Sequence, residues 1–275
     1  MRTSDAGRAD PVDHEALRQA VGAFAAEPCQ KRALEVLRLC MYGELLLDIT
    51  GSDASFPAQG SELRIHRGTG PDGKPALFAF TRNHEIARMH PPGTAYQSLV
   101  QPAHGVLELA RKQGAAWLYI DPAGPTCALS AAEIEFALRN PHNEALKKAL
   151  AQYGAGTVDR KAVLQFLRRE GPLILAADES QPGGARVRTL THDGRISLPA
   201  FTSAAEAVAY NSADATFAVT TLKALTMISQ HGYAGIVVNP GGPFIAFSTA
   251  ELFDQATPSE HRRSAPPPGR NHRCT

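Results

Sequence analysis

The sequence predicts an α+β protein in which one module is duplicated in tandem, each copy a mostly antiparallel sheet with packed helices. The first observation is an internal repeat, because residues 114–133 and 232–251 align without a gap and are identical at nine of twenty positions. The second is that the match extends upstream, pairing 73–87 with 194–208 and 31–38 with 160–167. The third is that helical spacing alternates with short apolar or alternating runs inside each copy.

The repeat divides the chain into consecutive parts. We expect a polar N-terminal segment at 1–28, a first module at 29–150, a second module at 158–257, and a tail at 258–275, with residues 151–159 joining the modules. The second copy is 11 residues shorter, and most of the difference falls in the loop at 50–60, where length changes cost little. The tail is rich in Pro and Arg, so we expect it to be disordered. A basic or proline-rich docking segment is its alternative role.

Each module is expected to run through a helix, three strands, a short helix, a long helix, a strand pair and a closing helix. In the first module these elements are 29–41, 43–49, 61–68, 76–81, 81–90, 102–114, 116–121, 126–130 and 130–140. In the second they are 160–167, 171–178, 185–191, 196–202, 202–211, 221–232, 234–239, 244–248 and 248–256.

Glycines mark the turns and helix ends in both copies. The dipeptides Asp72-Gly73 and Asp193-Gly194 are typical of hairpin turns and lead into the third strand of each module. The long helices each end at a glycine, which accepts the left-handed backbone of a helix stop. These local features give the same element order twice.

Helix starts are marked by hydroxyl side chains. Ser130 with Glu133, and Ser248 with Glu251, match the capping box that opens each closing helix. A Thr or Ser also precedes each short helix, at 81–90 and 202–211, and predicts an N-cap there.

The repeated Gly- and Pro-rich turns are the candidate binding site. Its residues are Asp121, Pro122, Gly124 and Pro125 in the first copy, and Asn239, Pro240, Gly242 and Pro243 in the second. Asp or Asn before Pro starts a turn and Gly supplies positive φ, so scaffold chemistry alone explains every shared residue. A phosphate loop would lead into a helix and carry a Lys-Ser/Thr pair, whereas here a strand follows. The functional alternative is an exposed recognition loop.

The sequence offers no catalytic residue, metal site or cofactor fingerprint. His84 and His90 lie six residues apart, on different faces of a short helix, and none of the ten histidines forms an H-E-x-x-H motif. A G-x-S-x-G nucleophile elbow is absent. The recurring Ser and Glu residues already serve as predicted helix caps. We therefore expect a protein that is not an enzyme.

Composition excludes several partners. The formal net charge is +1, which creates no strong field to attract nucleic acid or an anionic membrane. No apolar run approaches the roughly 18–20 residues that span a bilayer, and the N-terminus lacks the apolar core of a secretory signal. The four cysteines, Cys29, Cys40, Cys127 and Cys274, form no C-x-x-C pair and indicate free thiols in the cytoplasm.

Both copies resemble the N-terminal domain of the bacterial SseB, or enhanced-serine-sensitivity, family. The residues that carry the resemblance are "PALFAFT" (75–81), "SLPAFTS" (197–203), "LYIDPAGPTCALSAAEI" (118–134) and "GIVVNPGGPFIAFSTAEL" (235–252). The second copy is the better match, since the first has Asp121 where the second has Asn239. The resemblance covers nearly all of 29–257 and implies the fold of the unit, with no catalytic residues to carry over.

These observations together predict a non-enzymatic binding, adaptor or regulatory protein that acts on a protein partner. Two copies of one module can pack pseudo-symmetrically and form a groove between them. One alternative is an immunity protein that neutralises a toxin. Another is an enzyme of unrecognised type, which would need a pocket holding His or carboxylate groups with perturbed pKa values. The partner's identity and the oligomeric state stay open.

Overall fold

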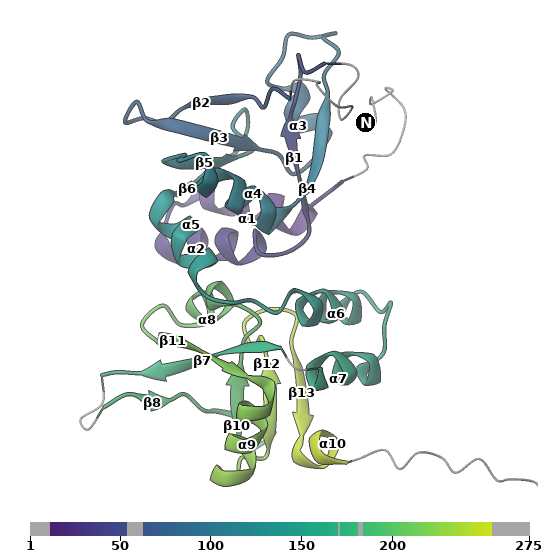
Figure 1. Cartoon of the computed structure of the whole chain (residues 1–275), viewed down its shortest axis with the longest axis vertical. Coiled ribbons are helices and arrows are strands. Elements are labelled where there is room, and N and C mark those ends of the chain that lie inside the picture. The colour runs from purple at the N-terminus through teal and green to yellow at the C-terminus, as the bar shows by residue number, and fades with distance from the viewer. Residues whose placement is uncertain (1–11, 54–62, 170, 181–183, 255–275) are drawn as a thin grey trace, which may run out of the picture.

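The computed structural model describes residues 12–53, 63–169, 171–180 and 184–254, which form two α+β modules stacked along the longest axis of the molecule (Figure 1). Each module has its own hydrophobic core, one drawn mainly from residues 17–137 and the other from residues 146–252. The tandem α+β prediction is therefore confirmed. Residues 1–11 and the expected disordered tail at 258–275 lie outside the described residues, as does most of the loop at 50–60.

The first module contains α1 (Glu15–Ala26), α2 (Gln30–Leu39), β1 (Glu44–Asp48), β2 (Arg67–Thr69), β3 (Pro75–Ala79), α3 (Asn83–Ala87), β4 (Ser98–Pro102), α4 (Ala103–Lys112), β5 (Trp117–Ile120), β6 (Cys127–Ser130) and α5 (Ala131–Arg139). Its larger sheet has the order β2-β3-β5-β6, and only the β3–β5 pair in it is parallel. Strands β1 and β4 form a separate antiparallel pair, joined to the larger sheet by the bridge between Leu46 and Phe80.

The second module contains α6 (Glu144–Gly154), α7 (Arg160–Arg168), β7 (Pro172–Asp178), β8 (Arg186–Val187), β9 (Leu190–His192), β10 (Arg195–Ala200), α8 (Ala204–Tyr210), β11 (Ala215–Thr220), α9 (Thr221–His231), β12 (Gly235–Val238), β13 (Ile245–Ser248) and α10 (Thr249–Phe253). It repeats the first topology, with sheet order β13-β12-β10-β9, a parallel β10–β12 pair, and a bridge between Ile174 and Phe201. The expected strand at 185–191 is split, because β8 pairs with β7 whereas β9 pairs with β10.

Helices α1 and α6 change the division of the chain that the sequence suggested. Residues 1–28 were expected to lie outside the first module, but α1 buries Leu17 and Val21 in its core. Helix α6 likewise buries Leu146 and Leu150 in the second core, so residues 143–157 belong to the second module. These leucine and valine positions are related by the same shift of 129 residues as α2 and α7. Each module therefore begins with a helical hairpin.

The two helical hairpins are attached to the sheets in the same way. The backbone amide of His14, the N-cap of α1, donates to the carbonyl oxygen of Thr81 at 3.0 Å. The amide of Asn143, the N-cap of α6, donates to the carbonyl oxygen of Thr202 at 2.8 Å. The two modules thus share this tertiary hydrogen bond as well as their sequence pattern.

The modules are arranged head to tail. Helix α8 of the second module packs against α2 and α5 of the first, while α3, the counterpart of α8, lies at the far end of the molecule (Figure 1). The face that carries α8 is therefore covered by the first module, whereas the equivalent face of the first module, which carries α3, has no module packed on it. In the described part of the chain, no helix has the length and apolarity needed to cross a membrane.

The helix caps follow the sequence prediction at three of the four helices where a cap was expected. Both closing helices have complete capping boxes, and Ser203 caps α8 by accepting from the backbone amide of Glu206. Helix α3 differs: its N-cap is Arg82, whose side chain makes no capping bond, because Arg82 stands where the second module has the capping Ser203. The hydroxyl of Thr81, one residue before the N-cap, donates to Asp121.

Replacing Ser130 with Ala is expected to lower the free energy of unfolding by about 1 kcal/mol, because it removes the capping bond to the amide of Glu133. Urea denaturation followed by circular dichroism measures the change. Ser130→Thr keeps a capping hydroxyl and should retain most of the stability. Equal losses in both variants would show that the cap is not the source of the effect.

Candidate functional site

The two predicted turns connect β5 to β6 and β12 to β13. Asp121 and Asn239 adopt positive φ values of 54° and 50°, a conformation that Asp and Asn tolerate better than most residues. Both side chains are buried, so the expectation of an exposed loop is wrong at these two positions. Pro125 and Pro243 are exposed. The remaining predicted residues, Pro122, Gly124, Pro240 and Gly242, are half-buried.

Each buried turn residue ties two neighbouring strand ends together. The Asp121 carboxylate accepts from the Thr81 amide at 2.9 Å and from its hydroxyl at 2.7 Å. The Asn239 side chain accepts from the Thr202 amide at 2.9 Å and donates to its hydroxyl at 3.0 Å. Burial raises the pKa of Asp121 to about 6 despite these hydrogen bonds. These contacts assign Asp121 and Asn239 a structural role.

The second turn also touches the first module. A β-carbon on Gly242 would lie 2.6 Å from the Nη1 atom of Arg38, which belongs to α2. In the first module, a β-carbon at the same position, Gly124, would lie 2.5 Å from the Nη1 atom of Arg88, the C-cap residue of α3. Glycine at both turns therefore lets a guanidinium approach the backbone, and in the second module that guanidinium crosses the module boundary.

A buried ionic network lies beside this contact. Glu206 of α8 is 2% exposed, with Lys147 Nζ 3.0 Å from one carboxylate oxygen and Arg38 Nη1 3.4 Å from the other. Lys147 Nζ also donates to the carbonyl oxygen of Arg38 at 2.7 Å. Burial lowers the pKa of Lys147, and the Glu206 carboxylate opposes that shift. The network connects α6 and α8 of the second module to α2 of the first.

The first module neutralises the equivalent carboxylate by itself. Glu85 of α3 corresponds to Glu206 and is paired with Arg82 at 2.8 Å and Arg88 at 2.9 Å, the two cap residues of its own helix. The second module has Ser203 and Ala209 at these two positions. The charge of Glu206 is consequently balanced from α6 and from the other module.

A cavity of about 350 Å³ lies at this boundary. It is lined by residues of both modules, among them His14, Tyr42, Lys147, Glu206, Asn239 and Pro243. Two of the predicted site residues thus line the inter-module cavity. This cavity lies between modules that pack head to tail, which differs from the expected pseudo-symmetric packing of the two copies.

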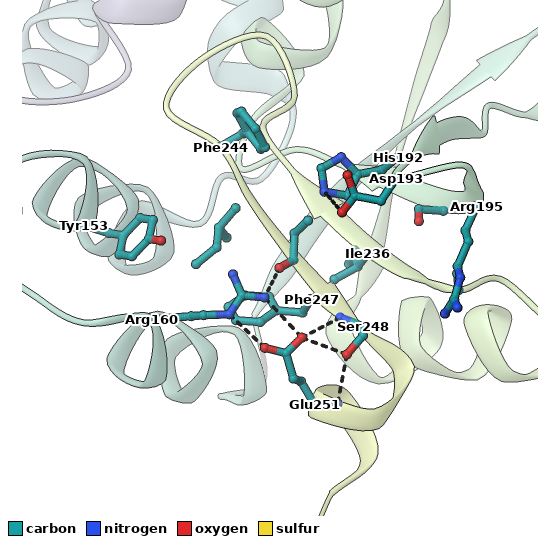
Figure 2. A pocket seen from close by; sticks show the side chains of 14 residues that line it. Tyr153, Arg160, His192, Asp193, Arg195, Ile236, Phe244, Phe247, Ser248 and Glu251 are labelled. Carbon is teal, nitrogen blue, oxygen red and sulfur yellow. Dashed lines mark hydrogen bonds and ion pairs between the residues drawn. The ribbon is translucent and has the colours of Figure 1, made fainter.

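A larger groove, of about 600 Å³, opens on the other side of the second turn (Figure 2). We define the groove by Tyr153, Arg160, His192, Arg195, Phe244 and Glu251, which are among the side chains that line it. Tyr153 and Arg160 come from α6 and α7, and His192 and Arg195 from the β9–β10 hairpin, with β13 running between them (Figure 2). Phe244 directly follows the turn and is 50% exposed. Sequence reasoning missed this groove, because its walls come from distant segments.

One carboxylate of the groove, that of Glu251, is already engaged. Arg160 Nε donates to Glu251 Oε1 at 2.8 Å, Arg160 Nη2 donates to the Ala246 carbonyl, and the guanidinium lies 4.6 Å from the centre of the Phe247 ring. The hydrogen bond from Arg160, with those from Ser248, lowers the pKa of Glu251 to about 2. Glu251 is therefore ionised near neutral pH and poorly suited to acid–base catalysis.

One difference between the two copies distinguishes the groove of the second module from the equivalent region of the first module. Trp117 of the first module corresponds to Gly235 of the second. The Trp117 indole covers the hairpin turn of its module and donates to Asp72 Oδ1 at 2.9 Å. In the second module a β-carbon at position 235 would lie 2.0 Å from the Phe247 carbonyl oxygen, so a side chain is excluded. The equivalent hairpin turn, with His192, lines the groove instead.

His84 and His90, the two histidines of the predicted short helix, do not contact each other. His84 is exposed, whereas His90 contacts Asp48 together with His66. A second group with metal-ligand chemistry comprises His104, His142 and Glu144. Neither combination was apparent in the sequence, because the residues of each group come from separate elements.

A sequence profile of the SseB protein N-terminal domain matches residues 17–135 and 146–260. The chain belongs to the SseB family. The two matches start 129 residues apart, inside α1 and α6, in agreement with the helical hairpin that opens each module. None of the curated proteins matches this SseB-family chain. Among solved structures it is similar to Anabaena Tic22, described as protein transport, at 11% identity over 78% of this chain and 94% of the other, with a TM-score of 0.17. A TM-score this low supports no conclusion about function.

Proposed function

We propose that this SseB-family protein is a non-enzymatic binding protein whose second module receives a segment of a partner protein in the groove. The observation that carries the proposal is the half-exposed aromatic ring of Phe244 in a groove where the Glu251 carboxylate is already paired with Arg160. Binding surfaces are typically built from exposed aromatic and arginine side chains on a rigid scaffold.

The side chains of the groove indicate what the partner segment should offer. Phe244 favours contact with an apolar or aromatic side chain. Arg195, in the β9–β10 hairpin, is exposed, and within the described residues it forms no ion pair, so it can bind an acidic group. We therefore expect a segment that combines an apolar anchor with a carboxylate.

Within the groove, the enzyme alternative has less support. The carboxyl group with a pKa raised to about 6 is Asp121, but it is buried and bonded to Thr81, away from the groove. Glu251, which lies in the groove, has its pKa lowered to about 2. A general acid or base near neutral pH would need a carboxyl group that lies in the groove and has a raised pKa.

A double variant, Phe244→Ser with Arg195→Glu, is expected to lose the partner while keeping the fold. Stability should change by about 1 kcal/mol at Phe244, which is half-buried against the His192 ring, and by no more than about 0.5 kcal/mol at the exposed Arg195. Affinity purification from the native host with quantitative mass spectrometry measures the loss, and circular dichroism checks folding.

The matched control is Leu222→Ser with Lys223→Glu on α9, where both residues are exposed and lie outside the groove. A protein retained by wild type and by this control, and lost by the groove variant, supports the proposal. A protein retained equally by both variants would contradict a role for the groove. Variants at Asn239 are poor probes, because its side chain holds the turn through Thr202.

A further inference from the structure

Three side chains with metal-ligand chemistry converge in the first module, away from the groove and the inter-module cavity. Asp48 ends β1, His66 immediately precedes β2, and His90 follows α3, at the end of the molecule opposite the second module (Figure 1). The side chain of Asp48 is fully buried, that of His90 is 13% exposed, and that of His66 is 41% exposed. The cluster can therefore be reached from solvent on the His66 side.

The geometry of the cluster is close to that of a coordination sphere. His66 Nδ1 lies 2.9 Å and His90 Nε2 lies 2.8 Å from the same atom, Asp48 Oδ2. All three ligand atoms lie within 4.8 Å of one another. Ligand atoms of a tetrahedral ion with bonds of about 2.0–2.2 Å are roughly 3.3–3.6 Å apart. An ion can therefore enter with small displacements of the three side chains.

Outer contacts already orient these groups. The other oxygen of Asp48, Oδ1, accepts from the backbone amide of Thr50 at 2.9 Å. The backbone amide of His66 donates to the carbonyl oxygen of Asp48 at 2.8 Å, and its ring packs edge-on against Phe78. Hydrogen bonds of this kind fix ligand orientation in metal sites.

The second module shows that the fold does not require these residues. There the amide of Arg188 donates to the carbonyl oxygen of Ala176 at 2.8 Å, which repeats the bond from His66 to Asp48. Ala176 and Arg188 thus replace Asp48 and His66, and Asn211 stands at the position of His90. Arg188 instead forms ion pairs with Asp178 and Asp214. The same backbone forms without any of the three ligands.

We propose that Asp48, His66 and His90 bind a divalent first-row transition-metal ion, with Zn²⁺ as the best match, and leave at least one coordination position to water. Two imidazoles and one carboxylate suit Zn²⁺ and its neighbours, whereas Ca²⁺ and Mg²⁺ prefer all-oxygen ligands. Three protein ligands with an open fourth position allow an exchangeable water or a partner's side chain to complete the sphere.

Isothermal titration of the metal-stripped, tag-free full chain with Zn²⁺ tests the site, and the visible absorption of added Co²⁺ reports the ligand field. We expect one ion per chain at this site. The variant Asp48→Ala, His66→Arg, His90→Asn, which installs the residues of the second module, should weaken binding by at least about 100-fold, since outer-shell changes alone cost about 10–100-fold. His66→Gln, at the most exposed ligand, should also weaken Zn²⁺ binding. This single variant replaces the triple variant in the test if the triple variant fails to fold.

The control removes the other ligand group, through His104→Ala with His142→Ala. Retained Zn²⁺ affinity in this control, with loss in the Asp48 cluster variants, supports the proposal. Three results would overturn it: no binding of Zn²⁺ or Co²⁺ by wild type, unchanged affinity in the cluster variants, or loss of binding only in the control.

Discussion

Replacing Asp121 with Asn is expected to stabilise the protein at neutral pH by on the order of 2–3 kcal/mol, and to leave its stability nearly unchanged below about pH 4. Burial raises the pKa of this carboxyl from 3.8 to about 6 in the folded protein. The folded state therefore favours the protonated form. Wild type has this contribution in full below pH 3.8 and loses it as the pH rises through about 6.

The second module suggests why Asn fits at this position. Asn239 has nearly the same φ, is equally buried, and satisfies the backbone amide and the hydroxyl of Thr202 without a charge. Urea denaturation of wild type and Asp121→Asn between pH 4 and pH 8 measures the difference at each pH. The reverse change, Asn239→Asp, should destabilise the protein above pH 6. A gain that is the same at pH 4 and pH 8 would contradict this account of Asp121.

Removing the Glu206 carboxylate is expected to destabilise the protein by about 3 kcal/mol, because Glu206→Ala leaves the buried ammonium of Lys147 without an anion, whereas Arg38 keeps its ion pair with Glu35. The loss should also weaken the contact between the modules, since Arg38 comes from the first and Glu206 from the second. Urea denaturation measures the free energy of unfolding, and limited proteolysis reports whether the modules separate.

Glu85→Ala is the matched control, because Glu85 holds the same position in the first module. Its partners Arg82 and Arg88 are 34% and 40% exposed, so they stay hydrated when the carboxylate is lost and the cost should be about 1 kcal/mol. Adding Lys147→Met to Glu206→Ala should recover part of the stability. Equal losses of unfolding free energy in Glu85→Ala and Glu206→Ala would contradict the claim that the inter-module network is more stabilising than the ion pairs of Glu85.

Local signals in the sequence predicted the repeat, the strands at the turns and the capping boxes, since these depend on residues a few positions apart. The start of each module was missed, although residues 14–17 (HEAL) and 143–146 (NEAL) match in sequence. The polar composition of the N-terminal segment does not reveal the apolar positions that α1 buries. Strands β4 and β11 were also missed, and the pairing with β1 and β7 supplies their structure.

The sites depended on contacts that no local pattern contains. The turn residues were identified, but the direction of the Asp121 carboxylate follows from its left-handed backbone and from Thr81, 40 residues away. The pair of Arg38 and Glu206 is separated by 168 residues, and the pair of Asp48 and His90 by 42. Comparing the copies, with Trp117 against Gly235, was the one sequence signal that could have indicated the groove.

The central claim, that the groove of the second module receives a partner, is tested most directly by photo-crosslinking in the native host. A photoreactive phenylalanine analogue replaces Phe244 in one strain and Leu222 in another, two exposed apolar positions of which only the first lines the groove. We predict a discrete crosslinked protein from position 244 that is absent from position 222. No product from position 244, or the same product from both positions, would contradict the claim.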